Sequence, residues 1–363
     1  MLNQVGTAFG IEGEIIRTEQ IDTGHINQTH YVLYRRKDGT EAGYTFQQIN
    51  TYVFKNPKKM MDNIGRVTKH IRDKVRAEGG DPFREVLHFL RAKNDERFFE
   101  MPDKSVWRVY NFIDGARTYD TATDTKVLQN AGEAFGLFQK RLADFPMDTL
   151  YETIPDFHNT EKRFNNLFDA IQEDPLKRAS EVKDDIEYFK KNFELAKTFN
   201  KLLSDRKICL RVTHNDTKYN NILIDDKTGK ALCVIDLDTV MPGLAAFDFG
   251  DAIRFAASSA AEDEKDLSKV YLDIEKYEAF TKGFIGASEG FFTDTETEYM
   301  ALGARMMTLE TAARFLEDYI RGDKYFRTHS SGQNLVRSRC QTQLARSMEK
   351  EYDTMRTIVE KYK

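Results

Sequence analysis

Hydrophobic and polar residues alternate along three short stretches near the start of the chain. The stretches are residues 15–20, 29–34 and 44–49. Alternation with a period of two is typical of strands that bury one face. We therefore expect an antiparallel N-terminal sheet whose first two strands are joined by the loop 22–27.

Apolar residues then recur at helical spacing between residues 58 and 76. They are Met60, Ile64, Val67, Ile71 and Val75. This spacing puts them on one face of a helix, which we expect to pack on the sheet. A further apolar strand is predicted at 106–113, just before Asp114 and Gly115.

Helical stripes dominate the chain beyond Gly115. They occur at 134–142, 300–320 and 335–359. The pattern predicts an α+β protein of two lobes. We expect an N-terminal sheet lobe at 1–110, a hinge at 111–116 and a larger, mostly helical lobe at 117–363 that carries a small catalytic sheet.

The stretch 211–225 carries the candidate chemistry. Two apolar, strand-like runs, 208–213 and 221–225, enclose a polar loop on which Asp216 lies. His214, Asp216 and Asn221 have the spacing of the protein-kinase motif H-R-D-x-x-x-x-N, with Asn215 in place of the Arg. In that motif the Asp accepts the proton of the substrate hydroxyl and the Asn holds Mg²⁺. Asp216 is therefore the candidate base of a phosphoryl transfer.

A second carboxylate is expected close to Asn221. A predicted turn at 225–230 and a return strand at 231–236 bring Asp236 toward Asn221. Magnesium prefers one or two carboxylates together with phosphate oxygens and waters. Asn221 and Asp236 are thus predicted Mg²⁺ ligands, and Asp238 would bind a second ion or orient the first. The alternative is an Asn/Asp-rich turn beside a buried strand.

Two further motifs have only a superficial likeness to nucleotide sites. The triplet Asp248–Gly250 matches the D-F-G of protein kinases, but it precedes a probable helix at 252–257. We expect Asp248 or Asp251 to cap that helix or to brace the catalytic loop. The stretch 228–231 is not a P-loop, because the required first Gly and the final Ser or Thr are absent.

Length and composition fit an enzyme of two lobes around one cleft. The 363 residues include 40% hydrophobic residues and 26 Phe, enough for sizeable cores. The net charge of -5 and the lack of long Lys/Arg runs argue against a nucleic-acid partner. The three cysteines fit no metal spacing, which favours a reduced, cytoplasmic setting. The first thirty residues lack a signal-peptide pattern, and no apolar run reaches the roughly 18 residues of a membrane span. The sequence therefore predicts no membrane partner. Oligomeric state has no signature in the sequence.

Five strings occur together in order along the chain. They are 24–27, 47–51, 211–218, 235–239 and 262–269. With them the chain resembles, nearly end to end, the N-acetylhexosamine 1-kinases of the aminoglycoside phosphotransferase and choline kinase superfamily. The resemblance implies a protein-kinase-like fold. It also implies ATP- and Mg²⁺-dependent phosphorylation of the anomeric C1 hydroxyl of N-acetylglucosamine or N-acetylgalactosamine.

The resemblance also implies roles for single residues. Asp216 would be the base for the C1 hydroxyl, and Asn221 and Asp236 would hold Mg²⁺. The hinge would bind adenine through the backbone of Asn111, Phe112 and Ile113.

Four residues match positions that the family uses around its sugar. They are His25, Phe255, Arg314 and Tyr325. Each also has a structural interpretation: His25 could cap a turn, Phe255 could lie in the core, Arg314 could pair with Glu310 or Asp318, and Tyr325 could pack.

The N-terminal lobe departs from the general kinase pattern. The loop 22–27 has one Gly in place of G-x-G-x-x-G, and Gln47 or Gln48 stands where a phosphate-pairing Lys is expected. The predicted helix 58–76 also lacks a Glu that could pair such a Lys. Lys218 is the candidate cation at the transferring phosphate. The rival hypotheses are another small-molecule kinase of the superfamily and a pseudokinase that binds a nucleotide without turnover.

Overall fold

The structure is a computed structural model of the chain, and it describes residues 1–21, 26–119 and 124–363. The chain forms two compact units. The first comprises Met1–Thr118, Arg141–Pro155 and Asn221–Pro242, and the second Tyr119–Lys140, Asp156–Asn220 and Gly243–Lys363. Two later segments thus belong with the N-terminal residues. The division into 1–110, a hinge at 111–116 and 117–363 stays a prediction.

The first unit contains a five-stranded antiparallel sheet in the order β1-β2-β3-β5-β4. Its strands are β1 (Glu14–Ile21), β2 (Gln28–Arg35), β3 (Glu41–Ile49), β4 (Phe99–Glu100) and β5 (Val106–Asn111). The predicted N-terminal strands are confirmed. Strand β5 begins where predicted and ends two residues earlier than expected.

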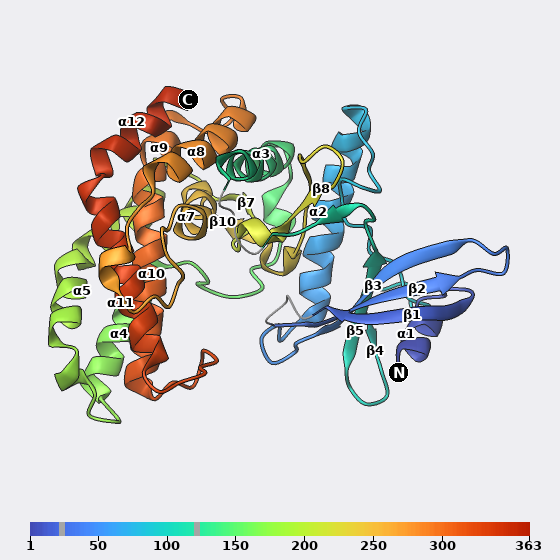
Figure 1. The fold of residues 1–363 in the computed structure, drawn as a ribbon, viewed down its shortest axis with the longest axis horizontal. Coiled ribbons are helices and arrows are strands. Elements are labelled where there is room, and N and C mark those ends of the chain that lie inside the picture. Colours follow the sequence, from blue (N-terminus) through green and yellow to red (C-terminus); the bar gives the residue numbers. More distant parts are fainter. Residues whose placement is uncertain (22–25, 120–123) are drawn as a thin grey trace. The chain divides into compact units, whose positions relative to one another are not determined.

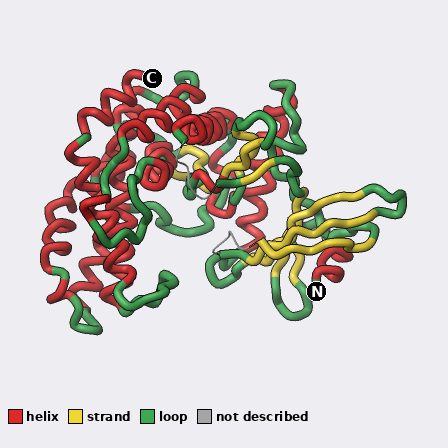
Figure 2. The backbone as a smooth tube through the Cα atoms, viewed as in Figure 1, coloured by secondary structure: helices red, strands yellow, loops and turns green. Residues whose placement is uncertain are grey.

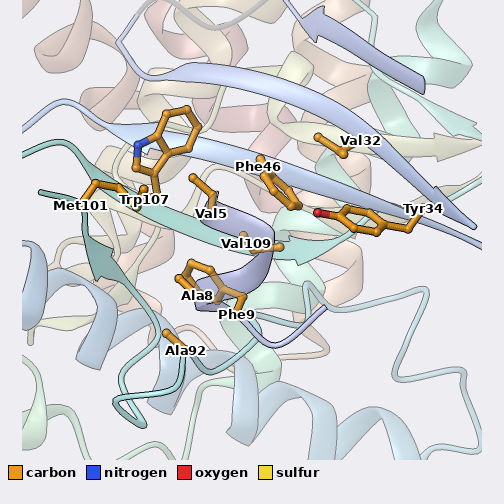
Figure 3. Close-up of a cluster of buried hydrophobic side chains, with 10 residues drawn as sticks. All are labelled: Val5, Ala8, Phe9, Val32, Tyr34, Phe46, Ala92, Met101, Trp107 and Val109. Carbon is orange, nitrogen blue, oxygen red and sulfur yellow. The ribbon is translucent and has the colours of Figure 1, made fainter. Parts of the chain in front are cut away.

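A hydrophobic cluster covers one face of this sheet (Figure 3). Helix α1 (Leu2–Ala8), which the sequence pattern did not reveal, contributes Val5 and Ala8 to it. They pack with sheet residues such as Phe46 and Trp107, both of which are fully buried. The buried residues of the alternating strands therefore form one core together with α1.

Helix α2 (Pro57–Ala77) buries the apolar face that its spacing predicts. Asn56 caps its start by accepting a hydrogen bond from the backbone N–H of Lys59 at 3.0 Å. Asn63 lies on the buried face and donates to the carbonyl oxygens of Tyr151 at 2.7 Å and Val240 at 3.0 Å. The two later segments of the first unit, 141–155 and 221–242, are therefore both hydrogen-bonded to α2.

A small antiparallel sheet, in the order β6-β8-β9, also belongs to the first unit. Its strands are β6 (Ala116–Arg117), β8 (Ile222–Asp225) and β9 (Ala231–Val234). The predicted hairpin between β8 and β9 is confirmed. Asp225 holds its turn by accepting from the backbone N–H of Thr228 at 2.8 Å and of Lys227 at 3.1 Å. These hydrogen bonds lower the pKa of Asp225 to about 2.

Helices make up most of the second unit, as Figure 2 shows. They are α3 (Thr125–Arg141), α4 (Thr160–Glu173), α5 (Lys183–Ala196), α6 (Thr198–Ser204), α7 (Ala245–Ala256), α8 (Ile274–Ser288), α9 (Asp294–Glu298), α10 (Met300–Arg321), α11 (Gln333–Lys350) and α12 (Tyr352–Tyr362). Helix α10 is buried along almost its whole length and packs against α4, α7 and α11 (Figure 1). The predicted α+β class, with a sheet lobe and a helical lobe, is confirmed.

The remaining elements are short. They are strands β7 (Arg211–Thr213) and β10 (Met241–Gly243) and the 3-10 helices η1 (Met147–Thr149), η2 (Ala179–Glu181), η3 (Tyr219–Asn221), η4 (Leu237–Thr239) and η5 (Leu267–Lys269). The run predicted as a strand at 208–213 pairs only from Arg211 onward, and the helix predicted at 252–257 already begins at Ala245. Every helix within the described ranges is too short or too polar to cross a bilayer.

Helices α7 and α10 approach each other at two glycines. A Cβ atom at Gly250 would lie 2.4 Å from the carbonyl oxygen of Gly303, and one at Gly303 would lie 2.2 Å from that of Ala246. Carbon and oxygen atoms that are not bonded cannot come so close, and backbone cannot turn aside as a flexible side chain can. This crossing therefore requires glycine.

Gly250→Ala should destabilise the protein by about 1–3 kcal/mol, because the new methyl group forces α7 away from α10. Gly286→Ala in α8 is the matched control, since its Cβ would meet no atom within 4 Å. That change should raise stability by about 0.5–1 kcal/mol through helix propensity. Midpoints of urea unfolding measure both. Equal shifts in the two variants would contradict the close packing.

Candidate active site

Helix α7 holds the backbone of the loop that carries Asp216. The carboxylate of Asp248 accepts from the backbone N–H of His214 at 2.9 Å and of Asn215 at 2.7 Å. Asp251, one turn later, accepts from the N–H of Thr217 at 3.0 Å. The expectation that Asp248 or Asp251 braces the loop of Asp216 is confirmed.

Asp248 is almost fully buried, and burial raises the pKa of its carboxyl. Gln139 also donates to it, at 2.6 Å, so the buried group is supplied with several donors. The hydroxyl of Thr217 donates back to the carbonyl oxygen of Asp248 at 2.5 Å. The loop is thus tied to α7 through both backbone and side chain, which allows Asn215 to keep a φ of 63°.

The side chain of Asp216 stays partly accessible within this braced loop, with 26% of its surface exposed. Lys218 Nζ lies 3.0 Å from Asp216 Oδ1 and 5.3 Å from the centre of the Phe255 ring. Burial would lower the pKa of Lys218, but the charges of Asp216 and Asp251 outweigh it, and the pKa lies above its ordinary value. Three of the predicted site residues, Asp216, Lys218 and Phe255, are therefore neighbours.

A histidine that the sequence analysis did not single out also contacts the loop. His158 Nε2 lies 2.9 Å from the carbonyl oxygen of Asn215, and its Nδ1 lies 2.9 Å from Glu310 Oε1. Glu310 is 152 residues further along the chain, on α10. No local motif joins these positions, so only the folded chain reveals the contact.

The predicted metal ligands Asn221 and Asp236 lie in the first unit. Asn221 immediately precedes β8, and its carbonyl oxygen accepts from the N–H of Ile235 at 2.9 Å, which brings the two strand ends together as expected. Asp236 is exposed and has a φ of 57°, a left-handed conformation that Asp tolerates better than most residues. The described residues contain no group of three or more His, Cys, Asp or Glu side chains that could hold a metal ion.

Asp238 has a different environment from Asp236. It is buried, its Oδ1 is hydrogen-bonded by Arg108 Nη1, and its Oδ2 accepts from Asn27 Nδ2 at 2.7 Å. A metal ion would have to compete with both donors. The metal-binding role of Asp238 stays a prediction, and its observed partner is a buried arginine.

The same arginine explains one of the glutamines in β3. Gln47 Oε1 accepts from Arg108 Nε at 2.9 Å and from Nη2 at 2.6 Å. Burial would lower the pKa of Arg108, but Asp238 outweighs it, and the pKa lies above its ordinary value. The first unit thus lacks the expected Lys on β3. It contains instead the buried Arg108 on β5, which is hydrogen-bonded to Gln47 and Asp238.

The predicted hinge residues are partly occupied by contacts within the first unit. The backbone N–H of Asn111 donates to the carbonyl oxygen of His88 at 3.1 Å, and that of Phe112 donates to Gly43 at 3.1 Å. Among the three backbone N–H groups, that of Ile113 is left as the candidate donor to adenine. The adenine-binding role of Asn111, Phe112 and Ile113 stays a prediction.

Among the predicted sugar residues, Arg314 and Tyr325 lie together in the second unit. The Arg314 guanidinium lies 5.8 Å from the ring centre of Tyr325 and 5.3 Å from that of Phe326. Asp318, a suggested partner of Arg314, instead accepts from the backbone N–H of Tyr325 at 2.8 Å and of Phe326 at 2.9 Å. Tyr325 is 71% exposed. His25 lies outside the described residues.

Solved structures share this fold at low sequence identity. An amicoumacin kinase is 11% identical with a TM-score of 0.56, and the match covers 95% of this chain and 92% of that one. A spectinomycin phosphotransferase is 10% identical with a TM-score of 0.55, covering 99% and 97%. A choline kinase from Cryptosporidium parvum is 14% identical with a TM-score of 0.54, covering 95% and 92%. The fold is therefore that of small-molecule kinases of the aminoglycoside phosphotransferase and choline kinase type.

A sequence model of the phosphotransferase enzyme family matches residues 48–280, which is more than half of the chain. The chain belongs to this phosphotransferase enzyme family. The matched range includes β5, the Asp216 loop and α7. The phosphotransferase part of the resemblance is thus confirmed, and the N-acetylhexosamine 1-kinase part stays a prediction.

Asp238→Ala should destabilise the protein by about 3–5 kcal/mol, because it leaves the buried Arg108 without a countercharge. The matched control is Glu41→Ala, which removes the exposed pair with Arg35 beside the turn between β2 and β3 of the same sheet (3.1 Å; side chains 50% and 46% exposed). That change should cost less than about 1 kcal/mol. Urea unfolding of the variants measures the difference. A small effect at Asp238 would show that Arg108 finds water or another acceptor.

Proposed function

We propose that the protein is an ATP-dependent kinase that phosphorylates the anomeric C1 hydroxyl of N-acetylglucosamine or N-acetylgalactosamine. The family supplies the reaction class, and the five sequence strings supply the acceptor. The observation that carries the proposal is the Asp216 loop. Its backbone is held by Asp248, Asp251 and His158, while the Asp216 carboxylate stays accessible.

Asp216 is proposed to orient the C1 hydroxyl and to accept its proton. The sugar oxygen forms its bond to the γ-phosphorus as the bond from that phosphorus to the bridging oxygen of ATP breaks, and ADP leaves. An anomeric hydroxyl is more acidic than an ordinary alcohol, so a carboxylate needs no strongly raised pKa to act on it. A fixed loop lowers the barrier mainly by positioning.

Lys218 is proposed to place its ammonium at the transferring phosphate. Its contact with Asp216 puts a cation beside the base, and its raised pKa keeps it charged at neutral pH. Arg108 is less suited to this task because its guanidinium is already held by Asp238 and Gln47. In this proposal Lys218 takes over part of the charge neutralisation for which other kinases use a Lys on β3.

Asn221 and Asp236 are proposed to hold Mg²⁺. One amide oxygen and one carboxylate at neighbouring strand ends match the hard oxygen donors that Mg²⁺ prefers, with nucleotide phosphates and waters completing its shell. The ion would neutralise charge on the phosphates. The amicoumacin kinase structure contains AMP-PNP and Ca²⁺, and the spectinomycin phosphotransferase structure contains ADP, which supports a nucleotide with a divalent cation here too.

The sugar is proposed to contact Phe255, Arg314, Tyr325 and His25. Tyr325 offers an exposed aromatic face of the kind that packs on the C–H face of a sugar ring. Arg314 is half-buried, and its guanidinium could donate to the acetamido oxygen or to hydroxyls. The backbone of Asn111–Ile113 is proposed to bind adenine.

Asp216→Asn should lower kcat by on the order of 10² to 10⁴, because the amide cannot accept the hydroxyl proton. Asp205→Asn, at an exposed helix end of the same unit, is the control and should leave the rate unchanged. Steady-state ADP release measures both variants, and circular dichroism checks that they fold. A rate near that of the unchanged protein would remove Asp216 from its proposed role.

The acceptor is tested by measuring ADP release from ATP and Mg²⁺ with N-acetylglucosamine, N-acetylgalactosamine, galactose, choline and spectinomycin in parallel. We expect turnover only with the two N-acetylhexosamines and a phosphorus NMR signal from a sugar 1-phosphate. Turnover confined to another acceptor would keep the kinase and reject the sugar assignment. Nucleotide binding without any turnover would favour a pseudokinase.

A further inference from the structure

His158 faces only hydrogen-bond acceptors through its two ring nitrogens. Nε2 lies 2.9 Å from the carbonyl oxygen of Asn215, and Nδ1 lies 2.9 Å from Glu310 Oε1. The hydroxyl of Thr160 donates to the other Glu310 oxygen at 3.0 Å. A carbonyl oxygen cannot donate, so Nε2 must carry a proton to make its hydrogen bond.

The second proton follows from the state of Glu310. Its carboxyl is buried, which would raise its pKa, but the hydrogen bond and charge of His158 lower the pKa below its ordinary value. A carboxylate only accepts, so with Glu310 ionised this contact requires a proton on Nδ1 as well. His158 is 9% exposed and Glu310 is 1% exposed, so solvent screens this pair weakly. These contacts fit an imidazolium between a carboxylate and a peptide carbonyl.

That carbonyl belongs to the peptide group that joins Asn215 to Asp216. Asp248 on α7 accepts from the backbone N–H of Asn215 at 2.7 Å, and His158 contacts the carbonyl oxygen of the same residue. Both backbone polar groups of Asn215 therefore have side-chain partners. Asn215 has a φ of 63°, so neither group can be satisfied by regular helix or sheet pairing. The orientation of this peptide sets where the Cα–Cβ bond of Asp216 points.

We propose that His158 is a positioning residue, which as an imidazolium held by Glu310 fixes the peptide before Asp216 and so aims the base. The inference rests on the proposed role of Asp216. Loss of the second ring proton leaves a neutral ring, which cannot donate to both oxygens at once. The peptide is then held less firmly, and Asp216 is aligned less precisely with the acceptor hydroxyl.

The charges around His158 favour the imidazolium. Glu310 on α10 contacts it directly, and Asp251 on α7 adds a second negative charge. The charges of Arg163 on α4 and Arg314 on α10 also help to lower the pKa of Glu310. Two aromatic rings also lie close: the ring centres of Phe157 and Phe247 are 4.5 Å and 6.3 Å from that of the imidazole.

These surroundings set the direction of a pH dependence. Burial would lower the pKa of His158, but the hydrogen bond and charge of Glu310 outweigh it, and the pKa lies above the ordinary value of 6.5. The stabilisation is therefore fully present below pH 6.5 and is lost as the pH rises through the higher pKa of the folded protein. Activity should fall on the alkaline side as this proton is released.

His158→Gln replaces the imidazolium with a neutral amide that does not titrate. We expect kcat to fall about 10- to 100-fold, while KM for ATP and for the acceptor stays within about twofold, because binding groups are untouched. The alkaline fall of kcat that His158 causes should disappear. A rise in KM with unchanged kcat would overturn the proposal, and so would an unaltered pH profile of kcat.

His70→Gln is the matched control. His70 also contacts a carboxylate, with Nε2 3.0 Å from Asp144 Oδ1, but both residues belong to the first unit, whereas the Asp216 loop belongs to the second. This change should leave kcat and its pH profile as they are. Equal losses in the two histidine variants would show a general effect of removing an imidazole–carboxylate pair.

Nitrogen-15 NMR of the histidine rings tests the imidazolium in the unaltered chain and needs no turnover. The chain has 7 histidines, and single His→Gln variants assign their signals. We expect the His158 ring to lose its second proton above pH 6.5, the ordinary value of its pKa. A change to the neutral ring at or below pH 6.5 would overturn the proposal even if His158→Gln failed to fold. An imidazolium in a protein without kinase activity would reject the proposed function alone.

Discussion

The buried carboxylate of Asp248 is the constraint on which the active-site region depends. The loop at 214–217 leaves regular structure, so its N–H groups need partners from side chains. Asp248 and Asp251 supply them from the first two turns of α7, and His158 supplies the donor for the loop's carbonyl at Asn215. A loop that is saturated with partners in this way can present an accessible Asp216 without moving.

The packing of helices in the second unit also supports the loop at 214–217. Helix α7 can hold the loop only if it is itself held, and the contact of Gly250 with Gly303 brings its backbone against α10. Helix α10 in turn carries Glu310, the partner of His158, and Arg314 one turn later. One buried helix therefore connects the brace of the catalytic loop to a proposed sugar-binding residue.

The first unit contains a buried arginine whose partners the motif spacing did not predict. Gln47 stands where a Lys was expected, and the structure shows that it binds Arg108 rather than leaving a gap. Asp238 completes this buried group, whereas Asp236, two residues earlier, is exposed. Residues that look equivalent in the sequence thus differ in what they are available to bind.

Local patterns in the sequence determined the strands of the N-terminal sheet, helix α2, the β8–β9 hairpin and the loop around Asp216, because each depends on spacing within a few residues. They also identified Asp248 and Asp251 as possible braces, since both stand just before a predicted helix. Only the tertiary structure decided that His158 contacts Asn215 and Glu310, or that Arg108 contacts Asp238. Those partners are 57 to 152 residues apart, and a hydrogen bond or buried ion pair between such distant residues leaves no period in the sequence.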